Sequence, residues 1–274
     1  MRSFVRIGGV PHHVEVTGRG PVCVLSAGLG LAWFDWDAVV ELLSPRRTVV
    51  NFDRPGLGLS GHARVAPSLA GEAARIASLL DALGLSGRPA TVVGHSLAGF
   101  HCEAFARLYP ARTSGLVLVD SSVEERPRVR TPRGARLGFA RACGAVLSGV
   151  GVPRAVGPWV RRMAVPGAPV DVVRQVYGTS RVLQASLVEY ATYGDAAAEL
   201  AVLRRKLPLP EGIPVTVLAA SAGASGSGSG KWLARQRGLA EELDAEFRVA
   251  EDSGHVVMRD RPAEVAEAVL GDGG

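Results

Sequence analysis

Short apolar runs alternate with longer amphipathic stretches along most of this 274-residue chain, and few folds accommodate that order. The short runs have the length of β-strands, and most end at a Gly, Asp or Ser, where a chain can turn. In residues 69–83, apolar side chains recur every three or four positions, which is the spacing of one helix face. We therefore predict an α/β fold with a mostly parallel, eight-stranded sheet. The predicted strands are residues 4–7, 14–16, 22–26, 48–52, 90–93, 116–119, 215–219 and 247–250, and further helices are predicted at 97–108, 232–243 and 262–270.

Residues 121–211 interrupt this alternation, because they contain no clear strand and are rich in Arg, Ala, Gly and Pro. They carry 14 Lys and Arg against 7 Asp and Glu, whereas the rest of the chain carries 17 and 19. We interpret them as a helical lid, inserted between strands six and seven of a core formed by residues 1–120 and 212–274. A basic segment leads into the apolar stretch at residues 142–152. We expect this segment to form a solvated face of the lid, with contact to anionic lipid or an acidic substrate as the alternative. Its arginines are Arg126, Arg128, Arg130, Arg133, Arg136 and Arg141.

Charge, hydropathy and cysteine content exclude several classes of protein. A formal net charge of +5 on 28.6 kDa is too small to indicate a nucleic-acid-binding protein. There is no run of 18 uncharged apolar residues and no signal peptide, so we expect a cytoplasmic protein without stable membrane insertion. The cysteines Cys23, Cys102 and Cys143 lack metal-binding spacing, and we expect buried thiols and no metal site. The Gly and Ser tract at residues 225–230 predicts a flexible loop, and the oligomeric state stays open.

The sequence Gly-His-Ser-Leu-Ala-Gly at residues 94–99 lies between the predicted strand 90–93 and the predicted helix 97–108. A sharp strand-to-helix turn of this kind lifts a serine hydroxyl above the edge of the sheet, where it can act as a nucleophile. The turn needs small neighbours because backbone packs against backbone; Gly94 provides one, and Ala98 stands where Gly is more common. The first N–H groups of the helix also point toward any oxyanion that forms at Ser96.

With this motif, the chain resembles the α/β-hydrolase superfamily over nearly its whole length. The resemblance implies a three-layer α/β sandwich and a catalytic triad in the order Ser, acid, His. His255 follows the last predicted strand and is the only His after residue 101, so we expect it to be the base for Ser96. Many relatives carry the acid after strand seven, but residues 220–230 contain no Asp or Glu. We therefore expect the acid to be Asp120, at the end of strand six, with capping of the first lid helix as its alternative role and Glu124 and Glu125 as nearby rivals.

The same resemblance implies a second backbone donor in the loop after the third strand. Relatives usually read His-Gly-x-Gly there, and this chain reads Ala-Gly-Leu-Gly at residues 27–30. We expect the N–H groups of Leu29 and Leu97 to form an oxyanion hole, with a purely structural turn as the alternative role of the two glycines. Gly28, Trp33 and His95 are expected to line the substrate pocket, with core or scaffold positions as the alternative for Trp33 and His95. The turn at residues 53–60 is expected to be structural.

These residues predict a serine hydrolase that cleaves a carboxylic ester or a related acyl compound through an acyl-enzyme on Ser96. A small-molecule acyl substrate is expected, without a cofactor. Ser96 excludes the haloalkane dehalogenases and epoxide hydrolases of this fold, which need an Asp nucleophile, but it leaves thioesters, amides and C–C bonds open. The alternative is a lyase or cyclase with His255 as its base, or a ligand-binding member of the same fold, acting in a biosynthetic pathway without hydrolysis.

Overall fold

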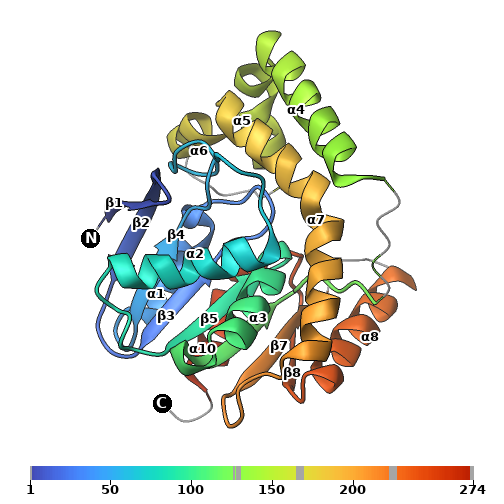
Figure 1. Cartoon of the computed structure of the whole chain (residues 1–274). Coiled ribbons are helices and arrows are strands. Elements are labelled where there is room, and N and C mark those ends of the chain that lie inside the picture. The colour runs from blue at the N-terminus through green and yellow to red at the C-terminus, as the bar shows by residue number, and fades with distance from the viewer. Residues whose placement is uncertain (1, 126, 128–130, 165–169, 222–226, 272–274) are drawn as a thin grey trace.

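The eight strands of the computed structural model form one sheet, in the order β1-β2-β4-β3-β5-β6-β7-β8 (Figure 1). The structure describes residues 2–125, 127, 131–164, 170–221 and 227–271. β2 pairs antiparallel with β1 and with β4, and all other neighbours are parallel, which confirms the mostly parallel sheet predicted from the sequence. The strands are β1 (Arg2–Ile7), β2 (Val10–Thr17), β3 (Val22–Ser26), β4 (Thr48–Phe52), β5 (Ala90–His95), β6 (Thr113–Val119), β7 (Val215–Ala220) and β8 (Glu246–Ala250).

The central strands are buried on both faces, which explains why they are continuous apolar runs rather than alternating ones. In β3, Val22 and Val24 join one hydrophobic cluster, whereas Cys23 and Leu25 join a second cluster on the opposite face. The first cluster packs under α2 (Leu69–Ala82), α3 (Leu97–Leu108) and α8 (Ser227–Glu242), and α2 and α3 lie in front of the sheet in Figure 1. The second packs against α1 (Asp37–Leu43), α9 (Val257–Asp260) and α10 (Pro262–Leu270). The chain is thus a three-layer sandwich.

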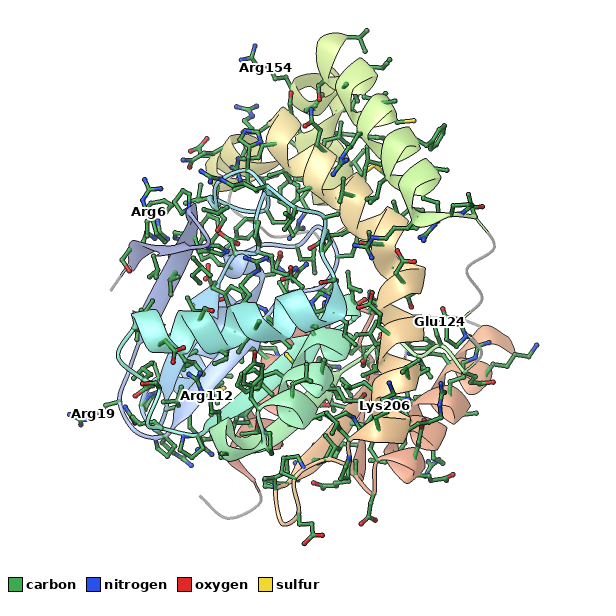
Figure 2. All side chains as sticks on the ribbon, in the orientation of Figure 1. Arg6, Arg19, Arg112, Glu124, Arg154 and Lys206 are labelled. Atoms are coloured by element: carbon green, nitrogen blue, oxygen red, sulfur yellow. The ribbon has the colours of Figure 1, made fainter. Side chains whose placement is uncertain are left out.

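In the part of the chain that the structure describes, four helices lie between β6 and β7, and together they form the helical insertion. The longest, α7, runs from the outer end of the insertion down to the core, where it packs against α3 (Figure 1). Arg133 and Arg136 of the basic segment pair with Asp195 of α7, at 3.3 and 2.5 Å, while Arg126, Arg128 and Arg130 lie outside the described residues. Arg154 points away from the ribbon at the tip of the insertion (Figure 2). The insertion comprises α4 (Arg133–Gly149), α5 (Val152–Ala164), α6 (Val170–Tyr177) and α7 (Ser180–Lys206).

Two local predictions were wrong or incomplete. The tract expected to be flexible is helical from Ser227 onward, because α8 begins there; residues 225 and 226 lie outside the described residues. The sequence analysis also did not predict α1 or the 3-10 helices η1 (Trp33–Trp36) and η2 (Pro110–Arg112).

Within the described part of the chain, no helix is both long and apolar enough to cross a membrane.

Candidate active site

Ser96 occupies the turn between β5 and α3. Its φ of 52° lies in the left-handed region, which is unfavourable for a residue with a side chain. The turn holds it there, because the Ser96 N–H donates to the Val119 carbonyl at 3.1 Å. A Cβ at Gly94 would come within 2.5 Å of the Ala98 carbonyl oxygen, so a turn this sharp requires glycine at that position. Ala98 is itself fully buried, and its methyl group fits inside the turn.

The structure brings Ser96, Asp120 and His255 together at the carboxyl edge of the parallel strands. His255 Nε2 lies 3.0 Å from Ser96 Oγ, and His255 Nδ1 lies 2.5 Å from Asp120 Oδ2. With Nδ1 protonated and donating to the carboxylate, Nε2 is left to accept from the serine hydroxyl. The His255 side chain is 51% exposed and the Asp120 side chain only 2%. The imidazole therefore faces solvent, while its carboxylate partner is sheltered.

Asp120 is held by groups that sequence reasoning did not identify. Its Oδ1 accepts from the backbone N–H of Ala220 at 3.0 Å and from the indole N–H of Trp232 at 2.7 Å. Both donors come from the end of β7 and from α8, so Oδ2 stays aimed at His255. The rivals make other contacts: Glu124 accepts from the Tyr193 hydroxyl at 3.4 Å, and Glu125 pairs with Arg235 at 3.7 Å. Each of these two acids is thus paired with a side chain other than His255.

His95 occupies the scaffold position that was the alternative to its expected place in the substrate pocket. It is 1% exposed, and its Nε2 lies 2.7 Å from the His255 carbonyl oxygen, so the ring supports the loop that carries His255 instead of lining a substrate pocket. Burial, together with the neighbouring His255, lowers the pKa of His95 to about 3. The ring is therefore neutral at pH 7, and Nε2 carries the proton that it donates to the carbonyl.

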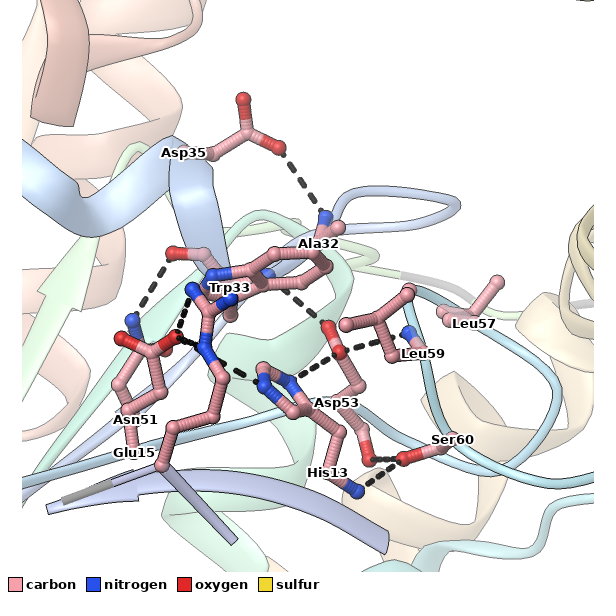
Figure 3. A network of polar contacts seen from close by, with 12 residues as sticks. His13, Glu15, Ala32, Trp33, Asp35, Asn51, Asp53, Leu57, Leu59 and Ser60 are labelled. Carbon is pink, nitrogen blue, oxygen red and sulfur yellow. Dashed lines mark hydrogen bonds and ion pairs between the residues drawn. The ribbon is translucent and has the colours of Figure 1, made fainter. Parts of the chain in front are cut away.

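Trp33 occupies the core position that was the alternative to its expected place in the substrate pocket. Its ring packs edge-on against His13, with the centroids 4.6 Å apart, and the backbone N–H of Trp33 donates to Asp53 Oδ1 at 2.9 Å (Figure 3). His13 Nδ1 lies 2.9 Å from Asp53 Oδ2, and Ser60 Oγ donates to the Asp53 carbonyl. This second Ser, His and Asp group is fully buried, and its serine is bonded to backbone groups. It braces the turn after β4, in line with the structural role expected for residues 53–60.

The loop after β3 lies directly against Ser96. A Cβ at Gly28 would come within 2.6 Å of His95 Nδ1 and 3.1 Å of Ser96 Cβ, so only glycine allows the backbone this close. Leu97 opens α3, where the first N–H groups of a helix have no partner inside it. The structure thus places the two predicted donor residues, Leu29 and Leu97, on the two segments that flank the Ser96 side chain.

A buried ion pair beside this loop was missed by the sequence analysis. Arg54, within the turn expected to be structural, contacts the carbonyl oxygens of Ala27 and Gly28, the latter at 2.8 Å. The same guanidinium binds Glu189 of α7 in bidentate fashion, at 2.7 and 3.0 Å. The only sequence signal was an arginine directly after a strand end and an acid among the apolar residues of a helix. Neither identifies its partner 135 positions away.

Comparison with known proteins agrees with this architecture. Residues 23–268 match the alpha/beta hydrolase family, and the chain belongs to it. A putative carbamate hydrolase of Azorhizobium caulinodans, RutD, is 33% identical over 114 residues, 41% of this chain and 42% of that protein. The chain thus matches less than half the length of this curated relative. Among solved structures, Cfl2 from Burkholderia cenocepacia has a TM-score of 0.76 at 22% identity, and the match covers 98% of this chain and 94% of that one. An esterase from Thermogutta terrifontis has a TM-score of 0.68 at 21% identity, and the match covers 98% of this chain and 97% of that one.

Proposed function

We propose that the protein is a serine hydrolase that cleaves a carboxylic ester or a related acyl compound. The observation that carries the proposal is the continuous chain of contacts from Ser96 Oγ through His255 to Asp120. A strained serine, a solvent-facing imidazole and a sheltered carboxylate are what acyl transfer requires. Membership of the alpha/beta hydrolase family and the partial similarity to a putative carbamate hydrolase support a hydrolytic reaction at a carbonyl group.

In the acylation step, Ser96 Oγ attacks the carbonyl carbon of the substrate while His255 Nε2 takes the hydroxyl proton. Asp120 stabilises the resulting imidazolium and keeps its Nδ1 proton in place. The tetrahedral intermediate carries its negative charge on the former carbonyl oxygen, which the N–H groups of Leu29 and Leu97 would bind. When the intermediate collapses, the bond to the alcohol breaks, and His255 protonates the departing oxygen. The acyl group is then an ester of Ser96.

Deacylation repeats these events with water. His255 removes a proton from a water molecule, and the hydroxide attacks the acyl carbon. The second tetrahedral intermediate expels Ser96 Oγ, which regains its proton from His255, and the carboxylic acid leaves. The 51% exposure of the His255 side chain gives this water a direct path to the base. Ester and water are thus converted to acid and alcohol, with every protein residue restored.

In this proposal, residues 121–211 act as the lid of the site and Gly28 lies in the pocket wall. The inner face of α7 reaches the loop that carries Leu29, since Glu189 accepts a hydrogen bond from the Gly30 N–H at 3.2 Å. A substrate at Ser96 therefore meets the insertion as well as the core. The boundary between α7 and the loop at residues 27–30 would select the acyl and alcohol groups. The curated relative does not indicate which groups these are, because the match covers less than half of its length.

Intact-mass labelling with a fluorophosphonate, alongside hydrolysis of p-nitrophenyl esters of increasing chain length, tests the proposal. Wild type should be labelled once, and Ser96→Ala should lose labelling and at least about 10⁴-fold in kcat. Asp120→Asn should lose about 10³- to 10⁴-fold, because the imidazole would then adopt the wrong tautomer. Ser60→Ala is the matched control, since Ser60 belongs to the other Ser, His and Asp group; its folded fraction should be labelled like wild type.

Two outcomes would contradict the proposal and favour the alternatives. Turnover that persists in Ser96→Ala but disappears in His255→Asn would indicate a lyase or cyclase that uses the imidazole as its base. A well-folded wild type that is neither labelled nor able to hydrolyse any ester of the series would indicate a ligand-binding protein.

A further inference from the structure

The loop at residues 27–30 is held almost entirely by side chains from outside it. From the core side, the Arg54 guanidinium binds two successive carbonyl oxygens, those of Ala27 and Gly28. The Gly28 carbonyl also accepts from the Leu31 N–H at 3.1 Å, which closes the turn. These contacts fix the first half of the loop. They also hold the peptide unit that joins Gly28 to Leu29 and carries the Leu29 N–H, but they do not engage the N–H and carbonyl of Gly30.

The second half of the loop is held from the helical insertion. Gly30 N–H donates to Glu189 Oε2 at 3.2 Å, and the Gly30 carbonyl accepts from the Tyr177 hydroxyl at 2.9 Å. Both polar groups of one peptide residue are thus bound by side chains from α6 and α7, 147 and 159 positions further along the chain. The Leu29 N–H lies in the planar peptide unit of the Gly28 carbonyl, and the Gly30 N–H lies in the next unit, so Arg54 and Glu189 together fix the two peptide planes on either side of the Leu29 Cα.

Close packing prevents this part of α7 from shifting. Gly30 has a left-handed φ of 67°, and a Cβ there would come within 2.9 Å of Ser186 Oγ. Gly56, with φ of 85°, would likewise bring a Cβ within 2.5 Å of the Ala185 Cβ. Two glycines on the core loops face two small residues on the helix, so the backbones approach closely. Glu189, one turn further along, is therefore placed by packing as well as by its own bonds.

The Arg54–Glu189 ion pair connects the two halves of this arrangement. Both side chains are buried, at 3% and 7% exposure, and one carboxylate oxygen, Glu189 Oε2, receives both the guanidinium and the Gly30 N–H. Loss of the carboxylate charge would leave Arg54 as a buried cation without its hydrogen-bonded counter-charge, with only Glu72 and Asp53 nearby. The loop would then be released at both ends, because the same arginine holds Ala27 and Gly28.

We propose that Glu189 and Tyr177 are positioning residues, which aim the Leu29 N–H at the oxyanion of the reaction. The inference rests on the proposed acyl transfer at Ser96, and it assigns the helical insertion a part in transition-state stabilisation beyond covering the site. Neither side chain needs to touch the substrate. Their effect is on a backbone donor, and such donors are worth most when they are held in place before charge develops.

Glu189→Gln and Tyr177→Phe test the inference, with Arg181→Gln as the matched control. Arg181 also ties α7 to the core, but it donates to carbonyl oxygens of the turn at residues 56–60, including Gly58 at 2.7 Å, and not to the loop at 27–30. Steady-state hydrolysis of p-nitrophenyl acetate would be measured together with inhibition by a trifluoromethyl ketone, which forms a tetrahedral adduct with the serine.

We expect Glu189→Gln to lower kcat about 10- to 100-fold with KM nearly unchanged, since only the transition state uses the oxyanion donor. The inhibition constant of the ketone should rise by the same factor. Tyr177→Phe, which removes a single oxygen, should lower kcat about 3-fold, by an analogous and smaller misalignment of the donor. Arg181→Gln should lower the melting temperature while kcat and ketone affinity stay within about 2-fold of wild type.

The inference is wrong if Glu189→Gln keeps wild-type kcat and ketone affinity, or if Arg181→Gln loses as much of both as Glu189→Gln does. If Glu189→Gln does not fold, Tyr177→Phe decides, because its ring and its packing are retained. Fluorophosphonate labelling of wild type separates this failure from failure of the proposed function. If wild type is labelled at Ser96 but Glu189→Gln and Tyr177→Phe keep wild-type kcat and ketone affinity, only the positioning role is refuted. If wild type is neither labelled nor active, the acyl-transfer reaction itself is refuted.

Discussion

The core and the helical insertion are stabilised by different means. Strands such as β3 and β5 are fully buried and apolar, and they are recognisable as such in the sequence. The insertion exposes large apolar side chains, among them Phe139 at 72% and Trp159 at 61%, and it is joined to the core both by apolar residues of α6 and α7 and by buried pairs of arginine and carboxylate. A local apolar pattern therefore specifies the core, whereas long-range contacts, buried charge pairs among them, specify where the insertion sits.

The second of these pairs joins Arg161 of α5 to Asp35 of η1. The side chains are 4% and 0% exposed, and the guanidinium also lies over the rings of Phe34 and Tyr177, with its carbon 5.5 and 5.2 Å from the centroids. Burial raises the pKa of Asp35, and Arg161 opposes that rise. The pair is thus a fixed contact at the outer part of the insertion, as Arg54–Glu189 is at the inner part.

The largest effect on stability is expected in the core. Phe105 of α3 is fully buried and stacks on Tyr109, with ring centroids 5.3 Å apart. Phe105→Ala should lower the free energy of unfolding by about 3–5 kcal/mol, because it removes apolar contacts and leaves a cavity. Urea denaturation followed by circular dichroism measures this loss. A loss below 1 kcal/mol would mean that the core tolerates voids and that the contrast with the insertion is mistaken.

Breaking the outer charge pair should have the next largest effect. Arg161→Met should lower the free energy of unfolding by about 3 kcal/mol at pH 7, because Asp35 would stay buried with only the more distant Arg259, at 3.6 Å, as its counter-charge. The loss should shrink as the pH falls, since protonation of Asp35 removes the buried charge. Adding Asp35→Asn to Arg161→Met should restore most of the stability while keeping an acceptor for the Ala32 N–H, 3.1 Å from Asp35 Oδ2. Equal losses in the single and double variants would show that the charge is irrelevant.

A smaller, pH-dependent effect is expected from His101, where α3 faces α7. Burial lowers the pKa of His101 from 6.5 to about 4, aided by Arg54 and Arg75 and opposed by Glu72. Between pH 6.5 and pH 4, His101 is therefore protonated in the unfolded chain but neutral in the folded chain. Its contribution to the free energy of unfolding is complete above pH 6.5 and is lost as the pH falls toward 4.

The change from pH 7 to pH 4 should amount to at most about 3 kcal/mol. Comparing urea denaturation of wild type with that of His101→Gln across this range isolates it, because other titrating groups are common to both proteins. Parallel stability curves for the two proteins would contradict the burial argument for His101.

The smallest effect is expected at the exposed apolar side chains of the insertion. Phe139→Ser should change the free energy of unfolding by less than about 0.5 kcal/mol, since a side chain that is 72% exposed loses little on replacement. The same denaturation experiment measures it, with Phe105→Ala as the reference. A loss comparable to that of Phe105→Ala would show that the insertion has an apolar core of its own.

The sequence predicts the parts of the molecule that depend on neighbours along the chain. The strands, the turn at Ser96 and an acid at the end of β6 are local features, and the geometry agrees with their predicted positions. For Trp33 and His95 the sequence left two roles open, because an aromatic or imidazole ring beside a site has the same local pattern whether it lines a pocket or fills the core. Tyr177 and Glu189 could not be found at all, since their relevance depends on a loop about 150 positions away and on how α7 crosses it.

The ion pair of Arg54 and Glu189 has a consequence for how such insertions evolve and can be exchanged. A chimaera that received a foreign insertion without a carboxylate at position 189 would bury Arg54 without its hydrogen-bonded partner and lose the contact to Gly30 at the same time. The insertion and Arg54, in the turn after β4, should therefore be inherited together. Across homologues, the residues at positions 54 and 189 should change together, and transfer of the insertion to another protein should succeed only when both residues are transferred.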